Sequence, residues 1–195
     1  MKLKDIAVVQ MGFSFRSRLE PEKSGDLAVI QMRDITERGL VQPHLLMTIH
    51  SQGINQHHFV KRQDLVFRSR GKTTTAAIID DDEIDRAIVV APLLRIRVTN
   101  DNILPIYLCW FINQPSSQAF LHSRATGTAM VMIGISVLHA LEVPVPSLAD
   151  QKKIIDLVIL ADRERELMAK ISIVKKYITD RDLMCLATHS EPIRN

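Results

Sequence analysis

The stretch PVPSLADQKKI, residues 144–154, decides how this chain is organised. Its two prolines keep the backbone extended, and Ser147 after them is a residue favoured as a helix N-cap. Asp150 then falls in the first turn, where a carboxylate suits the positive end of a helix. The stretch therefore predicts an extended approach up to Pro146 and a helix that starts at Ser147.

The segment that follows has the composition of one long helix. Neither glycine nor proline occurs between Pro146 and Pro192. We expect roughly 36 helical residues ending near Thr188, which at about 1.5 Å per residue make a rod on the order of 55 Å long. Apolar residues recur at steps of three or four and form one stripe: Ile154, Leu157, Val158, Ala161, Leu167, Met168, Ile171, Val174 and Ile178.

The stripe predicts contact with another helix, because a body of this size cannot cover so long a rod. A strict heptad counted from Ile154 also meets Glu164, Lys175 and Asp182, so the pattern is not that of an ideal zipper. The alternative is a helix that folds back onto its own body. The residues expected to contact a partner helix are Ile154, Leu157, Val158, Ala161, Met168, Ile171 and Ile178.

All seven glycines lie at or before Gly134, so a loop-rich body precedes the helix. Helices are predicted at Ile103–Ile112, continuing to Gln118–His122, and at Ser136–Leu141. We predict an α+β fold, with a mixed or antiparallel sheet in a body of residues 1–146 and a long C-terminal α-helix in residues 147–195. Short stretches rich in valine and isoleucine predict strands at Ile6–Val9, Leu27–Gln31, Gly39–Leu46, Asp64–Phe67, Ala76–Ile79, Ala87–Val98 and Leu141–Val145.

The composition is that of a folded protein. Its 195 residues are 46% hydrophobic and 24% charged, which excludes disorder over the whole length. Cys109 and Cys185 form no CxxC pair, so we expect a reducing compartment and no disulfide framework. The most apolar runs, Ala87–Leu94 and Ile103–Ile112, are too short to span a membrane, so we expect a cytoplasmic protein.

The net charge of +3 is concentrated near the N-terminus. Residues 1–75 carry 12 lysines and arginines against 7 acidic residues, whereas the rest of the chain is close to neutral. Such an excess is compatible with nucleic acid as a partner, and also with a solvated face.

Common enzyme motifs are missing from the sequence. It contains no GxxxxGKS/T, GxGxxG, HExxH or GxSxG pattern. The histidines within residues 44–58 are separated by loop residues, which favours surface histidines over a zinc site. The acidic residues of Asp80–Asp85 favour a hairpin tip between Ala76–Ile79 and Ala87–Val98 over a Mg²⁺ site. We therefore expect no catalytic residue, no metal and no cofactor.

Four loops carry basic residues, at residues 12–18, 33–34, 68–75 and 123–128, and all but Arg33-Asp34 add glycine, serine or threonine. Arginine suits phosphates and guanine edges, and glycine lets a backbone approach closely. Hydroxyl groups add further phosphate donors. The candidate DNA-binding residues are Arg16, Arg18, Arg33, Arg68, Arg70, Lys72 and Arg124.

The chain resembles a target recognition domain of the specificity subunit of type I restriction-modification systems. The matching segments are Lys2–Phe15, Val29–Ile35, Gln63–Gly71 and Leu141–Ile154. The most specific is the Pro-x-Pro-x-x-x-x-Gln pattern that ends at Gln151, which resembles the start of the family's long conserved helix. Two positions depart from the family pattern, since Gln63 stands where glycine is common and Asp150 where glutamate is usual.

The resemblance implies DNA-sequence recognition without catalysis. The usual subunit has two recognition domains and two helices, whereas this chain has one of each and resembles a half-subunit. The family's helices pair antiparallel, set the spacing between the halves of a bipartite site and dock methyltransferase subunits. Two copies of this chain would then form a homodimer that reads a symmetric site in double-stranded DNA, with methyltransferase and restriction subunits as partners.

Two other functions are compatible with the sequence. A helix-mediated interaction protein, such as a regulator or decoy of a restriction system, would keep the long helix and lose DNA reading. A metal-dependent nuclease would use Asp80–Asp85 or the histidine loops with a divalent ion.

Overall fold

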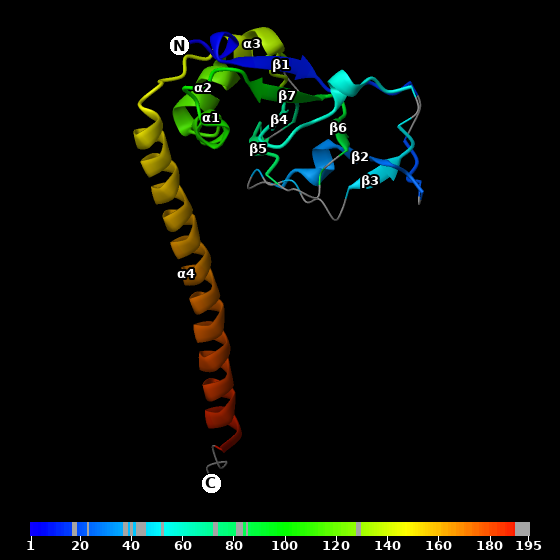
Figure 1. The fold of residues 1–195 in the computed structure, drawn as a ribbon. Helices are drawn as coiled ribbons and strands as arrows, with labels where there is room; N and C mark the ends of the chain where they lie inside the picture. The colour runs from blue at the N-terminus through cyan, green and yellow to red at the C-terminus, as the bar shows by residue number, and fades with distance from the viewer. Residues whose placement is uncertain are drawn as a thin grey trace. The chain divides into compact units, whose positions relative to one another are not determined.

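The computed structural model describes residues 1–16, 19–22, 24–36, 39, 41, 46–51, 53–71, 74–80, 84, 86–127 and 130–189. The chain divides into two compact units, unit 1 (Met1–Lys152) and unit 2 (Lys153–Asn195). In unit 1 the described residues form two β-sheets and several short helices, and in unit 2 they continue one long helix (Figure 1). The predicted α+β fold is confirmed.

The larger sheet has the strand order β1–β7–β4–β5, and each neighbouring pair is antiparallel. Ala7 lies opposite Val98, and Leu65 lies opposite Ile96. β4 and β7 are at the centre because most of their side chains are apolar and buried. The strands are β1 (Ala7–Met11), β4 (Leu65–Arg68), β5 (Ala76–Ile78) and β7 (Leu93–Val98).

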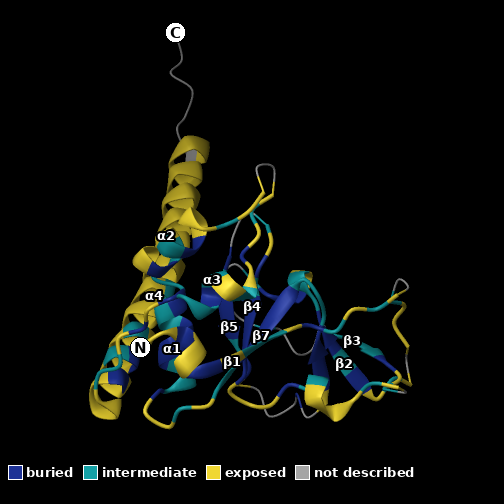
Figure 2. Cartoon of the chain, turned by 90° about the horizontal axis from the view of Figure 1, so that it is seen from above, coloured by how far each residue is buried: buried dark blue, intermediate teal, exposed yellow. Residues whose placement is uncertain are grey.

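The smaller sheet places β2 (Leu27–Ile30) between β3 (Met47–Ile49) and β6 (Ala87–Val89). β2 is antiparallel to β3 and parallel to β6. One hydrophobic cluster draws residues from both sheets, with Ile30 and Val89 from the smaller sheet and Val66 and Ala77 from the larger one. The two sheets therefore share a core, which Figure 2 shows as buried strands.

Short helices cover the larger sheet. α1 (Pro105–Ile112) packs against β5, and α3 (Ile135–His139) packs against β1 and the 3₁₀ helix η1 (Leu3–Asp5). α1 is followed by α2 (Pro115–Ser123). The Asn113 side chain extends the sheet, because its Oδ1 accepts from Ala76 N and its Nδ2 donates to Ala76 O, both at 2.8 Å.

Four predicted strands, β1, β2, β4 and β5, are found with small shifts at their ends. The segment predicted as one strand at Ala87–Val98 is instead β6 and β7, because Pro92 has no N–H group to continue a ladder. The hairpin predicted between β5 and β6 is wrong, since these strands belong to different sheets. Asp81–Glu83 and Asp85 lie outside the described residues.

The strand predicted at Leu141–Val145 is also wrong. The segment forms a single bridge, in which Glu142 pairs with Lys2, and Pro144 and Pro146 cannot donate further ladder hydrogen bonds. Of the strand predicted at Gly39–Leu46, residues 40 and 42–45 lie outside the described part of the chain. β3 was not predicted, because three residues give no periodicity and pairing with β2 makes them a strand.

The helix predictions hold with different ends. The segment predicted to run from Ile103 to His122 breaks between α1 and α2, because Pro115 starts a new helix. α3 ends at His139, with Ala140 as its C-cap. The long helix is α4 (Leu148–His189), and it begins where predicted, since Ser147 Oγ accepts from Asp150 N at 3.2 Å. Across the residues described, no helix has the length and hydrophobicity to cross a membrane.

Candidate nucleic-acid interface

Several loop segments meet around the contact between Ser69 and Pro92. The Ser69 hydroxyl donates to the Pro92 carbonyl, and the Ser69 carbonyl accepts from Ile133 N at 2.8 Å. At the same junction Ala91 N donates to Phe13 O at 3.1 Å. The loops that follow β1, β4 and β6 and the segment before Ile133 are therefore held together.

Gly12 permits the close approach of the first of these loops. A Cβ atom at this position would lie 2.6 Å from the carbonyl carbon of Val90, so a larger residue would force the backbone apart. The loop carries Arg16, whose side chain is exposed. The sequence signal of a glycine beside basic residues thus has a structural basis here.

Arg70 and Gly71 leave β4 at the same place. Gly71 N donates to Val131 O at 3.1 Å, and Arg70 Nε lies 3.0 Å from the sulfur of Met130. Gly71 has a φ of +121°, a conformation that favours glycine. The exposed guanidinium of Arg70 is therefore presented beside the segment that contains Met130.

Arg68 has a different role from its neighbour. Its Nη2 donates to the carbonyls of Met32 and Ile35, both at 2.7 Å. These carbonyls lie in and just after the 3₁₀ helix η2 (Met32–Asp34), which carries Arg33. The Arg33 side chain is 66% exposed, so Arg68 positions the turn that presents Arg33.

A groove of about 700 Å³ opens beside these loops. Its walls combine apolar side chains with the polar groups of Ser14, Gln31 and Arg33. Such a mixture allows both van der Waals contact and hydrogen bonding to a ligand. Apolar residues of the wall include Phe15, Met32, Met47 and Pro92.

We call the surface formed by Arg16, Gln31, Arg33, Arg70, Met130 and Met132 the basic loop surface. Three of the predicted DNA-binding residues, Arg16, Arg33 and Arg70, contribute to it. Arg68 contributes indirectly, because its hydrogen bonds fix the position of η2. Arg18 and Lys72 lie outside the described residues. Arg124 lines a different cavity, where it stacks on Phe120.

Sequence reasoning did not single out Gln31, Met130 and Met132. Gln31 lies within the matching segment Val29–Ile35, which is the signal that pointed toward it. Met130 and Met132 carry no such signal. They reach this surface because Met132 forms bridges with both Arg70 and Thr126.

Two further arginines serve the fold. Arg95 Nη1 donates to the carbonyls of His57 and Phe59 at 2.9 and 2.8 Å, and its Nη2 donates to Gln10 Oε1 at 2.6 Å. Burial lowers the pKa of Arg95, whereas hydrogen bonds to the Asp64 carboxylate raise the pKa of its neighbour Arg97. Their spacing on β7 turns both side chains toward the segment before β4.

The described histidines of residues 44–58 make local contacts. His50 Nε2 lies 2.7 Å from Glu22 Oε2. The rings of His57 and His58, in the 3₁₀ helix η4 (Gln56–His58), have centroids 3.9 Å apart, and burial lowers the pKa of His58. In the part of the chain that the structure describes, which omits His44 and most of the acidic run, no three His, Cys, Asp or Glu residues could hold a metal ion.

Comparison with known proteins gives a family assignment. The model of the type I restriction modification DNA specificity domain matches residues 1–174. No curated protein matches the chain. The chain belongs to the family of type I restriction-modification DNA specificity domains.

Solved structures share this fold at low sequence identity. The HsdS subunit from Thermoanaerobacter tengcongensis aligns with a TM-score of 0.59 and 17% identity over 84% of this chain and 37% of its own. A chain from a study of complex assembly and conformational transition of the type I R-M system aligns with a TM-score of 0.66 and 12% identity, over 92% and 42%. The S subunit from M. genitalium aligns with a TM-score of 0.54 and 14% identity, over 98% and 46%. This chain spans less than half the length of each.

Proposed function

We propose that this chain reads DNA sequence for a type I restriction-modification system and has no catalytic activity of its own. The observation that carries the proposal is the family match over residues 1–174. The basic loop surface supports it, since Arg16, Arg33 and Arg70 lie on loops that converge at one junction. Arginine donors suit phosphates and guanine edges, and the groove beside them offers Gln31 for a base edge.

The salt dependence of DNA binding tests this proposal. We expect the chain, mixed with its methyltransferase partner, to select a sequence from a library of double-stranded DNA. Its affinity for that sequence should fall steeply between 50 and 200 mM salt, on the order of tenfold or more, because phosphate contacts release counterions. Binding that is absent or independent of salt contradicts DNA reading.

We further propose that two copies pair through α4 and present two recognition domains. The described residues of unit 2, up to His189, form a single helix, so among them the apolar stripe meets no second helix. Leu157, Met168 and Ile171 are 67%, 60% and 47% exposed, which supports a face available to a second helix (Figure 2). Ile154 and Val158 are half-buried and Ala161 and Ile178 are exposed.

The spacing of exposed side chains supports a paired helix. Leu157, Leu160, Leu167, Ile171, Val174 and Ile178 are separated by alternating steps of three and four residues once Glu164 is counted. Charged residues between them form pairs along the helix, such as Lys170 Nζ with Glu166 Oε1 at 2.7 Å. A seam of this kind, broken by one acidic residue, suits association at a defined register.

Sedimentation distinguishes this pairing from a helix folded onto its own body. Met168→Glu combined with Ile171→Glu should convert a dimer into a monomer and leave the unfolding of unit 1 unchanged. Lys176→Glu, which changes the charge by the same two units at an exposed position away from Met168 and Ile171, is the matched control and should retain the dimer. A wild-type chain that sediments as a monomer at tens of micromolar contradicts the paired helix.

The partners proposed for this dimer are a methyltransferase subunit and a restriction subunit, in the cytoplasm. The type I R-M complex among the structural neighbours supports a role in assembly. We expect co-purification of the chain with a methyltransferase subunit, and loss of DNA methylation when either protein is omitted. Mg²⁺-dependent cleavage of DNA by the chain alone contradicts a non-catalytic role.

A further inference from the structure

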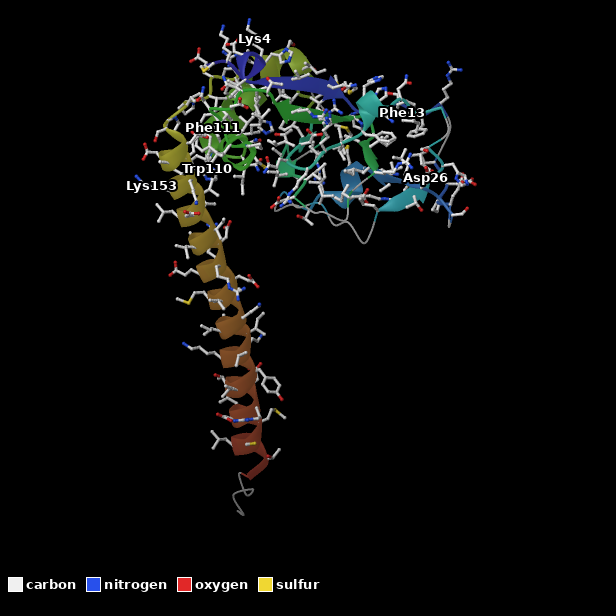
Figure 3. The ribbon with its side chains drawn as sticks, viewed as in Figure 1. Lys4, Phe13, Asp26, Trp110, Phe111 and Lys153 are labelled. Atoms are coloured by element: carbon white, nitrogen blue, oxygen red, sulfur yellow. The ribbon has the colours of Figure 1, made fainter. Side chains whose placement is uncertain are left out.

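A second cavity, of about 380 Å³, lies in unit 1 where α2 faces the bridge between Lys2 and Glu142. Its walls include Phe111 from α1 and Phe120 from α2. Figure 3 shows Phe111 on the helical side of unit 1. Phe13, which lies where the loops of the basic loop surface meet, is on another side. The cavity is therefore separate from the groove beside Arg33.

Two cations line this cavity, Lys2 and Arg124. The guanidinium carbon of Arg124 lies over the Phe120 ring, 4.0 Å from its centroid, where the ring attracts the cation. Its remaining contact is a hydrogen bond to Ser123 Oγ at 3.3 Å. Among the described residues neither cation forms an ion pair, so both have donors available for an anion.

The N-terminus of α2 adds to this positive environment. Pro115, Ser116 and Ser117 form its first turn, and both serines line the cavity. The N-cap residue Gln114 makes no capping hydrogen bond, and its side-chain Nε2 donates to Trp110 O at 2.9 Å. The first N–H groups of α2 thus have no side-chain acceptor from the cap, and they favour an anion.

Ser117 points independently to a ligand. Its residue is 2% exposed and lines the cavity, and its Oγ has no hydrogen-bond partner among the described residues. Leaving a buried hydroxyl unpaired is unfavourable. An oxygen of a bound anion would supply the missing partner.

We propose that this cavity binds the carboxylate of an acidic side chain, flanked by apolar residues, on a protein partner. Lys2, Arg124, Ser116 and Ser117 would bind the carboxylate oxygens, and Phe111 and Phe120 would pack against the flanking apolar groups. A DNA phosphate suits the site less well, because the two phenyl rings in the walls offer contacts to apolar groups, which a phosphate backbone does not carry next to its charge. The proposal does not depend on DNA reading by the basic loop surface.

Two matched peptides test the proposal. We titrate the ¹⁵N-labelled full chain with Ac-Leu-Glu-Phe-NH₂ and with Ac-Leu-Gln-Phe-NH₂, and follow the amide signals of Ser116 and Ser117. The glutamate peptide should bind about tenfold more tightly, since charge-assisted hydrogen bonds are about twice as strong as neutral ones. Equal affinity for the two peptides, or signals that move only elsewhere, overturns the proposal.

Variants and a second titration locate the carboxylate. Arg124→Gln and Ser117→Ala should each weaken binding of the glutamate peptide several-fold and leave that of the glutamine peptide unchanged. Arg70→Gln, on the basic loop surface, is the control and should bind both peptides like the wild type. If inorganic phosphate or a DNA duplex shifts the Ser116 and Ser117 signals and the glutamate peptide does not, the site is a nucleic-acid contact and the proposal is wrong.

Discussion

Asp64 holds Arg97 in a two-point ion pair, with Arg97 Nε 2.7 Å from Asp64 Oδ1 and Nη2 2.6 Å from Oδ2. Asp64 is 2% exposed, and its Oδ2 also accepts from Lys61 N at 2.7 Å. The carboxylate therefore joins the turn before β4 to a side chain of β7. Within the family-like segment Gln63–Gly71, this contact gives a structural reason for the aspartate.

Replacing Asp64 with asparagine should destabilise the fold strongly. It leaves the Arg97 guanidinium without its carboxylate in a partly buried site, which costs about 3 kcal/mol, the lower end of the range for broken buried pairs. Arg97 is 27% exposed, and solvent reduces the loss. Urea unfolding measures this loss in the free energy of unfolding. The control is Asp80→Asn, which breaks the exposed pair with Arg62 and should cost less than about 0.5 kcal/mol. Equal losses of stability in the two variants would contradict a special role for the Asp64–Arg97 pair.

Gln63→Gly should stabilise the protein. Gln63 has a φ of +67°, a left-handed conformation that costs a residue with a Cβ about 1–2 kcal/mol. Glycine removes this strain but gains entropy in the unfolded chain, so the net gain is about 0.5 kcal/mol. Gln63→Ala keeps the Cβ and should give no gain in thermal unfolding. An alanine variant as stable as the glycine variant contradicts the strain at this position.

The sequence anticipated those features that depend on local chemistry. The Pro-Val-Pro-Ser start of α4 was predictable because prolines and an N-cap act within a few residues. The departure from the family-like pattern at Gln63 was also visible in the sequence, and the positive φ found there is a conformation that favours glycine. Ala87–Val98 was misread because one apolar run supplies strands to two sheets, and pairing partners far along the chain decide that division.

In the candidate site, too, contacts between residues far apart in the chain could not be predicted from the sequence. Arg68 and Arg70 look equivalent in sequence, yet one donates to backbone carbonyls of η2 and the other is exposed. The alternation of side chains at the end of β4 does not reveal which of them meets a carbonyl group. Arg124 likewise resembled a loop arginine, yet it is the C-cap of α2 and lies over the ring of Phe120, four residues earlier in that helix.

Gln151→Leu should loosen the junction that starts α4. Gln151 is fully buried in unit 1, where its Oε1 accepts from Leu104 N at 2.9 Å. Its Nε2 donates to Asn102 O at 2.7 Å and to Pro146 O at 2.9 Å. Leucine leaves these three groups unpaired, at a cost of about 3 kcal/mol in the free energy of unfolding. The control is Lys152→Leu at the exposed neighbouring position, which should cost less than about 0.5 kcal/mol. If both changes lower the free energy of unfolding by a similar amount, the Gln151 amide has no special role.

The pKa of His58 predicts how stability depends on pH. Burial, with the charges of His57 and Arg95, lowers this pKa below 6.5, so the unfolded chain binds a proton more readily than the folded one. The contribution of neutral His58 is complete above about pH 6.5 and is lost as the pH falls through the folded-state pKa. Urea midpoints measured from pH 7.5 to pH 5 should therefore fall less steeply in His58→Gln than in the wild type. Parallel curves would show that His58 does not link protonation to unfolding.

Arg70→Gln should weaken DNA binding in a way that depends on salt. If Arg70 contacts one phosphate, its loss reduces the slope of log affinity against log salt by about one, and the loss of affinity is largest at low salt. Arg62→Gln removes an exposed charge that is paired with Asp80 away from the basic loop surface, and it should leave the slope unchanged.

Arg68→Met should instead lower the free energy of unfolding by about 2 kcal/mol, since the two carbonyls of η2 lose a charged donor. Fluorescence anisotropy at several salt concentrations, with urea unfolding of each variant, separates these effects. Equal slopes for Arg70→Gln and Arg62→Gln would show that only net charge matters and that the basic loop surface makes no defined phosphate contact.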